Sequence, residues 1–305
     1  MTHFLVTGVS GLLGLNFALA VDGKKHQVTG IANTAPMNWA SFKNYQSELT
    51  VPGAMDDLIN THKPDVVLHC AALANVDACE TDPQAAARVN AELPGEIAAA
   101  CGRHSVRMIQ VSTDAVFDGS KGNYDEDDET NPLSVYARTK LEGEKAALAA
   151  NPETLVVRVN FYGWSAAGNR SLAENFVHNF SDGKEMMGFT DVIFCPMNIL
   201  DLSDLIVESS EQHLRGVYHM TGAEPMSKYD FGVKIARKFG FDPSLIKPVS
   251  VTESGLKAAR SPNLSLSTAK LRQALGHDLP SFDGGLQKFY DQYRRGYNLF
   301  IKSLN

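Results

Sequence analysis

Cysteine, basic charge and long apolar runs are all scarce in this chain of 305 residues. No apolar run approaches the roughly 18 residues that a helix needs to cross a bilayer, so we expect no membrane span and no membrane partner. The four cysteines, Cys70, Cys79, Cys101 and Cys195, are too few and too scattered for a disulfide framework or a zinc knuckle. We therefore expect free thiols and a reducing, cytoplasmic location.

Negative charge outweighs positive charge along the chain. The 28 lysines and arginines face 35 aspartates and glutamates, which gives a formal net charge of -7 at pH 7. This balance argues against broad electrostatic capture of nucleic acid or of an anionic lipid surface. Hydrophobic residues make up 44% of the sequence, which is typical of a globular core. We therefore expect a globular protein without a nucleic-acid partner.

Short apolar runs alternate with amphipathic stretches through the first half of the chain. We predict strands at residues 3–7, 28–32, 48–51, 65–70, 108–112 and 154–159. We predict helices at residues 11–21, 56–62, 82–103 and 134–150, the last one capped by Ser134. This alternation predicts an α/β fold with a doubly wound parallel sheet, whose strands all end at the edge where ligands bind.

The pattern loosens after about residue 160. We predict sheet pieces at residues 192–195 and 216–220, and helices at residues 173–180, 202–213, 228–239 and 268–275. Residues 1–160 should form the sheet domain and residues 161–305 a smaller, mostly helical substrate lobe, with residues 190–222 returning partly to the sheet. Tyr290, Tyr293 and Tyr297 could pack against the lobe or a second subunit, which leaves a homodimer open. The acidic run 125–129 is predicted to be a solvated loop.

Three glycines join the first predicted strand to the first helix in the stretch from Thr7 to Gly14. Gly8 permits a tight turn, Gly11 lets a diphosphate approach the backbone, and Gly14 lets the helix and strand pack closely. The free N–H groups at the start of the helix favour the phosphates. The turn therefore predicts a nicotinamide dinucleotide bound to a Rossmann-type sheet.

The residues after the second predicted strand bear on the choice of dinucleotide. A carboxylate there would bind the ribose hydroxyls of NAD, but the chain has Asn33. The missing carboxylate removes repulsion against a 2′-phosphate, for which Lys24, Lys25 and Lys43 are candidate partners. We therefore favour NADP, with NAD as the alternative.

Tyr136 and Lys140 are four residues apart and share one face of a predicted helix. A neighbouring ammonium and an oxidised nicotinamide both favour the phenolate, so we expect them to lower the pKa of Tyr136. Such a tyrosine can give a proton to the oxygen of a carbonyl that receives a hydride. Thr113 ends the buried strand some 20 residues earlier and can hold that oxygen. We predict Thr113, Tyr136 and Lys140 as the catalytic residues.

These residues resemble the extended short-chain dehydrogenase/reductase superfamily, and within it the dTDP-4-dehydrorhamnose reductases. The resemblance rests on the stretches 7–14, 69–72, 112–119 and 131–136. It implies that NAD(P)H reduces the 4-keto group of a nucleotide-linked deoxysugar. The predicted cofactor contacts are Gly8, Ser10, Gly11, Leu12, Leu13, Gly14, Asn33, Cys70, Ala71, Ala72, Asn90, Val111, Ser112, Tyr136 and Lys140. The predicted substrate contacts are Asn75, Asp114, Phe117, Phe161 and Trp164.

Two departures and a second resemblance qualify this picture. Phe161 stands where these reductases usually carry tryptophan, with Trp164 nearby, so the identity of the sugar stays open. Asn16 replaces a glutamate that ligates Mg²⁺ in some members, so we expect no metal. The stretches 216–222 and 226–229 are also similar to the regulatory β subunit of methionine adenosyltransferase. A non-catalytic NADP-binding regulatory subunit and a nucleotide-sugar epimerase or dehydratase are therefore the alternative functions.

Overall fold

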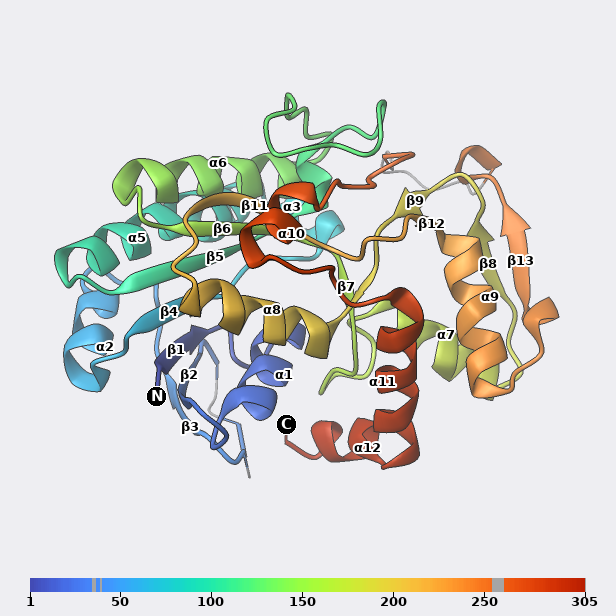
Figure 1. Ribbon diagram of the computed structural model, residues 1–305, viewed down its shortest axis with the longest axis horizontal. Coiled ribbons are helices and arrows are strands. Elements are labelled where there is room, and N and C mark those ends of the chain that lie inside the picture. Colours follow the sequence, from blue (N-terminus) through green and yellow to red (C-terminus); the bar gives the residue numbers. More distant parts are fainter. Residues whose placement is uncertain (35–36, 39, 254–260, 305) are drawn as a thin grey trace.

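A seven-stranded parallel sheet forms the centre of the computed structural model, which describes residues 1–34, 37–38, 40–253 and 261–304 (Figure 1). The strands lie in the order β11-β6-β5-β4-β1-β2-β3. Their bounds are β1 (His3–Thr7), β2 (Gln27–Ala32), β3 (Lys43–Gln46), β4 (Val66–His69), β5 (Arg107–Thr113), β6 (Leu155–Val159) and β11 (Gly216–Met220). The strands β2 and β3 are added on one side of β1, and β4 and the strands after it are added on the other side. This change in strand order between β1 and β4 opens a crevice at their carboxyl ends. The predicted doubly wound sheet is confirmed.

Helices cover both faces of this sheet, as Figure 1 shows. One face carries α1 (Leu12–Val21) and α8 (Ile199–Glu211), and the other carries α2 (Ala54–His62), α5 (Leu93–Arg103) and α6 (Val135–Ala150). The four residues of β4 are all buried, because both faces of this central strand are covered. The side chain of Ser134 caps α6 as predicted, accepting a hydrogen bond from the Ala137 N–H at 3.2 Å.

The third strand lies earlier in the chain than predicted. It is Lys43–Gln46, whereas the predicted residues 48–51 form the turn that follows it. This strand pairs only with β2 and is mostly exposed, so burial does not select apolar residues along it. The apolar residues at 48–51 therefore did not mark the strand, and the predicted position was wrong.

The predicted helix 82–103 is interrupted. It begins as α4 (Pro83–Ala86), widens to one π-helical segment, η1 (Ala87–Glu92), and continues as α5. A separate short helix, α3 (Val76–Thr81), precedes it. A π-helical turn rotates the side chains that follow it, and such turns often occur at functional sites. Here the turn contains Asn90.

The rest of the chain forms a mostly helical lobe with three two-stranded sheets. Its helices are α7 (Leu172–Ser181), α9 (Lys228–Phe239), α10 (Ala269–Leu275), α11 (Phe282–Arg294) and α12 (Tyr297–Lys302). Its strands pair as β7 (Phe161–Tyr162) with β10 (Met197–Asn198), β9 (Ile193–Phe194) with β12 (Met226–Ser227), and β8 (Met186–Phe189) with β13 (Ile246–Val249). The helices α11 and α12 and the pair β8–β13 were not predicted. The division into two domains stays a prediction.

One continuous core joins the lobe to the α1 and α8 face of the sheet. Trp164 is fully buried in it, stacked on Phe289 with 4.2 Å between ring centroids and on Tyr293 at 5.7 Å. Its Nε1 donates to the Phe289 carbonyl at 3.1 Å. The prediction that Trp164 contacts substrate is therefore wrong, because packing in the lobe uses the whole indole ring.

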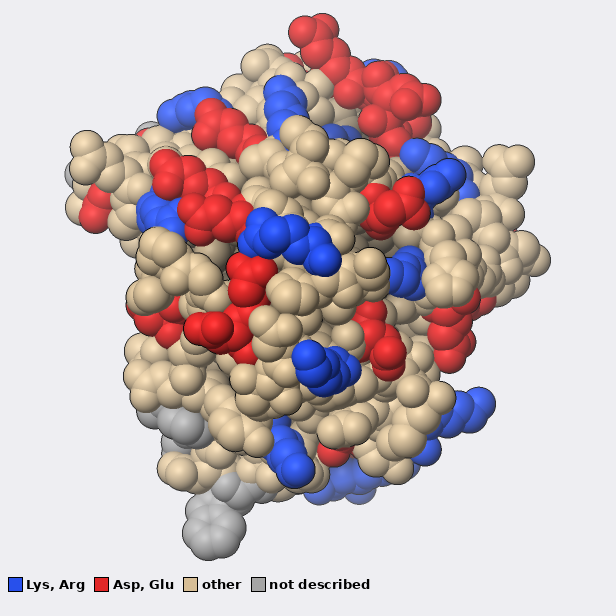
Figure 2. All heavy atoms as spheres, turned by 90° about the vertical axis from the view of Figure 1, so that its left-hand side faces the viewer, with Lys and Arg blue, Asp and Glu red and all other residues tan. Residues whose placement is uncertain are grey.

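Surface charge is mixed on the face in Figure 2, where acidic and basic side chains are interspersed. The acidic run 125–129 is not wholly solvated as predicted, because Glu126 is half-buried and its carboxylate accepts from the His219 backbone N–H at 2.8 Å. This contact ties the loop to β11. All four cysteines are free, as predicted. No helix in the described part of the chain is long and apolar enough to span a membrane.

Candidate active site

The glycine turn lies at the crevice between β1 and β4. Gly8 has a positive φ of 64°, and a Cβ on it would lie 2.7 Å from the backbone nitrogen of Ala71. A Cβ on Gly14 would lie 2.6 Å from the Gly8 carbonyl oxygen. Glycine is therefore required at both positions. At Gly8 it allows the positive φ and the close contact with the loop after β4, and at Gly14 it allows α1 to pack on the turn.

Two adjoining cavities follow this crevice. The first has a volume of ≈ 360 Å³ and reaches from the glycine turn to Asn33, and the second, of ≈ 260 Å³, reaches from the turn to Tyr136 and Lys140. All predicted cofactor residues except Asn90 line one of them. We call the two cavities together the cofactor groove. The groove extends to both sides of the glycine turn, as a dinucleotide site does, while the contacts themselves stay predictions.

Asn90 lies behind the groove and does not line it. Its side chain accepts from the Leu73 N–H at 2.9 Å and donates to the Leu73 carbonyl at 3.0 Å, and it also donates to Thr139 at 3.3 Å. The predicted direct contact with cofactor is therefore wrong for this side chain. Asn90 instead fixes the loop after β4 against α6, and it can do so because the π-helical turn aims it there.

The end of the groove beside Asn33 contains an acidic side chain that was not predicted. Glu48 lines this end, and hydrogen bonds from Thr50 hold its pKa below the usual value, so it is charged at neutral pH. Neither Lys24, Lys25 nor Lys43 lines the cavity. The lysines proposed as partners of a 2′-phosphate therefore do not reach this end in the structure.

Thr113 and Tyr136 meet at the other end of the groove. Thr113 is the last residue of β5, and Tyr136 lies in the first turn of α6, where a hydrogen bond joins the two side chains. Burial raises the pKa of Tyr136 to about 12, the charge of Asp114 adds to the rise, and the bond to Thr113 opposes it. The predicted lowering of this pKa is wrong for the protein groups alone. Tyr136 is thus the protonated phenol, the form that can donate a proton.

Lys140 is buried one helical turn beyond Tyr136. Its ammonium donates to the Val111 carbonyl of β5 at 2.6 Å. Burial lowers its pKa to about 8, against the opposing charge of Glu144. His69 is also buried, and its burial together with the charge of Lys140 lowers its pKa to about 3, so this histidine is neutral. Lys140 is therefore a positive charge held at the floor of the groove.

A buried ion pair supports this floor. Glu144 accepts from Nη2 of Arg158 at 2.8 Å, and both side chains are at most 5% exposed. The hydroxyl of Ser112 donates to the same carboxylate. Ser112 lines the groove, so its predicted contact with cofactor stays a prediction, with its hydroxyl already bonded to Glu144.

Asp114 is a buried acid beside Thr113. It accepts from Thr113 Oγ1 at 3.1 Å and from Asn160 Nδ2 at 2.6 Å. Burial raises its pKa to about 6, against the effect of these hydrogen bonds. A carboxyl with this pKa exchanges its proton near neutral pH, and in its charged form it accepts the single proton of the Thr113 hydroxyl.

The other predicted substrate residues differ in their exposure. Phe161 is half-buried and lines the groove, and exposed Asn75 caps α3 by accepting from the Ala78 N–H at 2.9 Å. Phe117 is fully buried, stacked on Tyr124 at 4.2 Å and covered by the Arg158 guanidinium 5.1 Å from its centroid. Its predicted contact with substrate is wrong, because the ring belongs to the core beneath the site.

Sequence reasoning missed residues that only tertiary contacts bring to the groove. Arg170 lines both cavities, and Glu48 and Val89 line the first. Thr7 Oγ1 accepts from the Ala71 N–H at 3.4 Å and bonds to Nδ1 of His69 at 2.7 Å, which fixes the β4 loop. Only Thr7 had a signal, as the last residue of the strand before the glycine turn.

Comparison with known proteins agrees with this geometry. The family model for the RmlD substrate binding domain matches residues 1–295. A dTDP-4-dehydrorhamnose reductase from Mycobacterium tuberculosis is 32% identical over 87% of this chain and 85% of its own. The methionine adenosyltransferase 2 subunit beta of Bos taurus is 31% identical over 88% of this chain and 80% of its own.

A solved structure shows the same architecture. The dTDP-4-dehydrorhamnose reductase of Clostridium acetobutylicum superposes with a TM-score of 0.84 at 29% identity, over 96% of this chain and 99% of its own. The sheet and the groove define a Rossmann-type protein of the short-chain dehydrogenase/reductase class. Within that class, the chain belongs to the RmlD substrate binding domain family.

Proposed function

We propose that the chain is an NAD(P)H-dependent reductase of a keto group on a nucleotide-linked deoxysugar. The observation that carries this proposal is the meeting of Thr113, Tyr136 and Lys140 at the end of the groove farthest from Asn33. A dinucleotide laid along the groove from the glycine turn brings its nicotinamide to these residues. The M. tuberculosis relative is named for such a reduction.

The reaction needs a hydride for the carbonyl carbon and a proton for its oxygen. A bound NAD(P)H supplies the hydride. The Thr113 hydroxyl holds the carbonyl oxygen, and the Tyr136 phenol, protonated because of its raised pKa, donates the proton. The buried ammonium of Lys140 supplies positive charge that favours the phenolate left behind.

NADPH is the proposed cofactor and NADH the alternative, because Asn33 and not a carboxylate follows β2. The charged Glu48 beside Asn33 counts in favour of NADH, so the two dissociation constants need to be compared. A cytoplasmic location and a homodimer also belong to the proposal. The location rests on the free cysteines, whereas the tyrosines near the C-terminus pack within the chain, Tyr293 on Trp164 and Tyr297 on Asn16, and do not by themselves support the dimer.

The test is NADPH and NADH oxidation with a panel of dTDP-, UDP-, GDP- and CDP-linked 4-keto sugars. Tyr136→Phe should lower turnover at least about 100-fold while the affinity for cofactor stays within about twofold. Tyr45→Phe, a matched change on an exposed tyrosine of β3, should leave both unchanged. Equal turnover by Tyr136→Phe would remove the proton-donor assignment.

A regulatory role is the second candidate, because the B. taurus relative is named a subunit of methionine adenosyltransferase. Binding of dinucleotide without oxidation by any keto sugar, together with co-purification with an adenosyltransferase, would favour it. A tightly retained NAD that turns over without net oxidation would instead indicate an epimerase or a dehydratase.

A further inference from the structure

One side chain of the lobe lies over the cofactor groove. Arg170 lies between β7 and α7, outside the sheet. It lines the cavity that reaches Asn33 and also the cavity that reaches Tyr136. Among the described residues, the two cavities share only Gly8, Gly11, Cys70, Ala72 and Arg170. Arg170 therefore lies where the halves of the groove meet, across from the glycine turn.

The segment that carries Arg170 is anchored to a buried carboxylate. Glu174 is fully buried and accepts from the backbone N–H of Ser165 at 2.6 Å and from the Ser165 hydroxyl at 2.7 Å. It also accepts from the backbone N–H of Arg170 and of Ser171, each at 3.2 Å. Ser171 and Glu174 form a capping box at the start of α7. The backbone of Arg170 is thus held in place while its side chain is exposed.

The segment is also tied to the helix that follows the glycine turn. Asn16 of α1 donates to the Trp164 carbonyl at 2.8 Å, at the other end of the same connection. A bond from the Tyr297 hydroxyl to Asn16 Oδ1 at 3.0 Å brings the C-terminal helices to this point. Arg170 therefore keeps a set position relative to the turn.

The Arg170 guanidinium is available to bind an anion at the junction of the two cavities. Within the described part of the chain, no carboxylate pairs with the Arg170 guanidinium, whereas Lys140, the other cation lining the groove, donates to Val111. The turn opposite leads into α1, whose N-cap residue Gly11 makes no side-chain cap hydrogen bond, and the N–H groups in the first turn of such a helix favour an anion. A guanidinium facing such a helix start suits a diphosphate, since it can bond two oxygens at once.

We propose that Arg170 binds the diphosphate of the dinucleotide from the lobe side, so that the anion is held between the guanidinium and the glycine turn. The proposal rests on the proposed dinucleotide site and adds the residue that closes it. A 2′-phosphate would lie at the Asn33 end, beyond the junction. The diphosphate of a nucleotide sugar would lie beyond Tyr136, on the opposite side of the junction.

The experiment measures dissociation constants of the full chain and its Arg170→Gln variant by calorimetric titration. The probes are NADPH, NADH, ADP-ribose and adenosine, with thymidine diphosphate as a stand-in for the sugar nucleotide. Arg170→Gln should weaken NADPH, NADH and ADP-ribose by a similar factor of about 10 to 100, since each loses one charge-assisted contact. Adenosine and thymidine diphosphate should change less than about twofold. Arg170→Lys should recover part of the loss.

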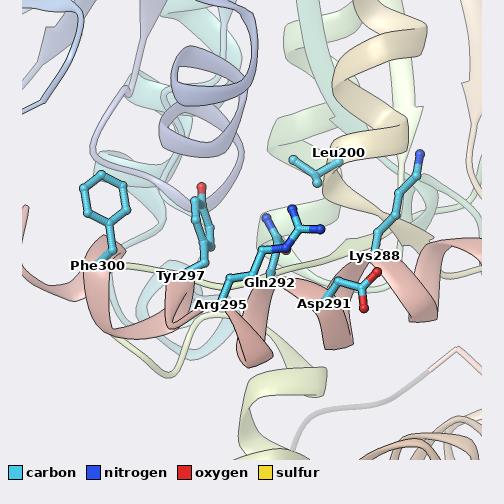
Figure 3. A pocket seen from close by; sticks show the side chains of 7 residues that line it. All are labelled: Leu200, Lys288, Asp291, Gln292, Arg295, Tyr297 and Phe300. Carbon is cyan, nitrogen blue, oxygen red and sulfur yellow. The ribbon is translucent and has the colours of Figure 1, made fainter.

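The matched control is Arg295→Gln. Arg295 is an exposed arginine in a separate pocket between α8, α11 and α12, where Figure 3 shows it beside Gln292 and below Leu200. This variant should bind every probe as the unmodified chain does. Melting temperatures without ligand should agree for all variants, because Arg170 is exposed.

Each remaining outcome overturns a defined statement. Unchanged affinity of Arg170→Gln for ADP-ribose would overturn the proposal while leaving the dinucleotide site in place. A loss confined to NADPH would assign Arg170 to a 2′-phosphate, and a loss confined to thymidine diphosphate would assign it to the substrate. If the unmodified chain bound neither NADPH nor NADH, the proposed function itself would fail.

Discussion

The two walls of the cofactor groove are each organised by one buried glutamate, in different ways. Under the catalytic wall, Glu144 pairs with Arg158 and accepts from Ser112. Under the lobe wall, Glu174 accepts only from neutral groups, namely three backbone N–H groups and one hydroxyl. One carboxylate is thus compensated by a full positive charge and the other by dipoles.

The difference affects what each wall can tolerate. A buried ion pair is costly to break, because the remaining charge is left without a partner in the interior. Dipoles compensate only part of the cost of burying a charged carboxylate. Burial therefore raises the pKa of Glu174, against the hydrogen bonds that it accepts. The catalytic wall should therefore be more sensitive to loss of charge than the lobe wall.

The largest expected effect is on the catalytic wall. Glu144→Gln should lower the free energy of unfolding by about 3 to 5 kcal/mol, because Arg158 keeps a buried charge with only neutral neighbours. Those neighbours are Phe117 and His219, whose pKa is lowered to about 4 by burial and the charge of Arg158. Urea unfolding measures the change.

A surface pair provides the control for this change. Glu153 and Arg215 form an ion pair in which both side chains are 67% exposed. Glu153→Gln should change the free energy of unfolding by less than about 1 kcal/mol. Equal effects of the two glutamine variants would contradict the contrast between buried and exposed pairs.

A pH effect of intermediate size is expected from Asp114. Its pKa is 3.8 in a model compound and about 6 in the folded chain, so the folded state binds the proton more tightly. Its contribution to stability is therefore greatest at low pH and falls as the pH rises from about 4 to about 6, by at most about 3 kcal/mol. Asp114→Asn should remove this dependence.

Urea unfolding of both proteins at pH 4.5 and 7.5 checks the sign. The variant should gain stability relative to the unmodified chain as the pH increases. A relative loss over the same range would show that Asp114 is stabilised as the anion, contrary to the effect of its burial.

The smallest effect is expected on the lobe wall. Glu174→Gln keeps one acceptor but turns an amide group toward the N–H donors, which should cost about 1 to 2 kcal/mol. Because these donors include the backbone N–H of Arg170, affinity for ADP-ribose should fall about 5- to 10-fold while that for adenosine is unchanged. Calorimetric titration of both ligands decides whether the wall acts through Arg170.

The sequence allowed the sheet and the positions of the proposed catalytic residues to be predicted because their signals are local. The strand that ends at Thr113 is apolar and continuous, and the spacing of Tyr136 and Lys140 follows from a single helix. The glycines of the turn were predictable for the same reason, since the local backbone conformation or a close contact requires a residue without a side chain there.

The errors share a different cause. Trp164 and Phe117 were expected to face the substrate because of the family resemblance, yet both rings are buried. Trp164 stacks on Phe289, far along the chain, and Phe117 lies between Tyr124 and the Arg158 guanidinium. The strand at 43–46 was missed because an edge strand needs no apolar pattern. Asn90 was assigned to cofactor because no local pattern showed the π-helical turn that redirects it.

The sequence by itself determined the order of strands and helices, the glycine turn and the tyrosine–lysine pair, because hydrophobic periodicity and short-range spacing encode them. Only the tertiary structure decided what faces the groove from outside the sheet. Arg170 reaches it because Glu174 and Asn16 fix a lobe segment against α1. The contact of Asn16 with Trp164 joins residues 148 positions apart, and no local pattern records which side chain it leaves exposed.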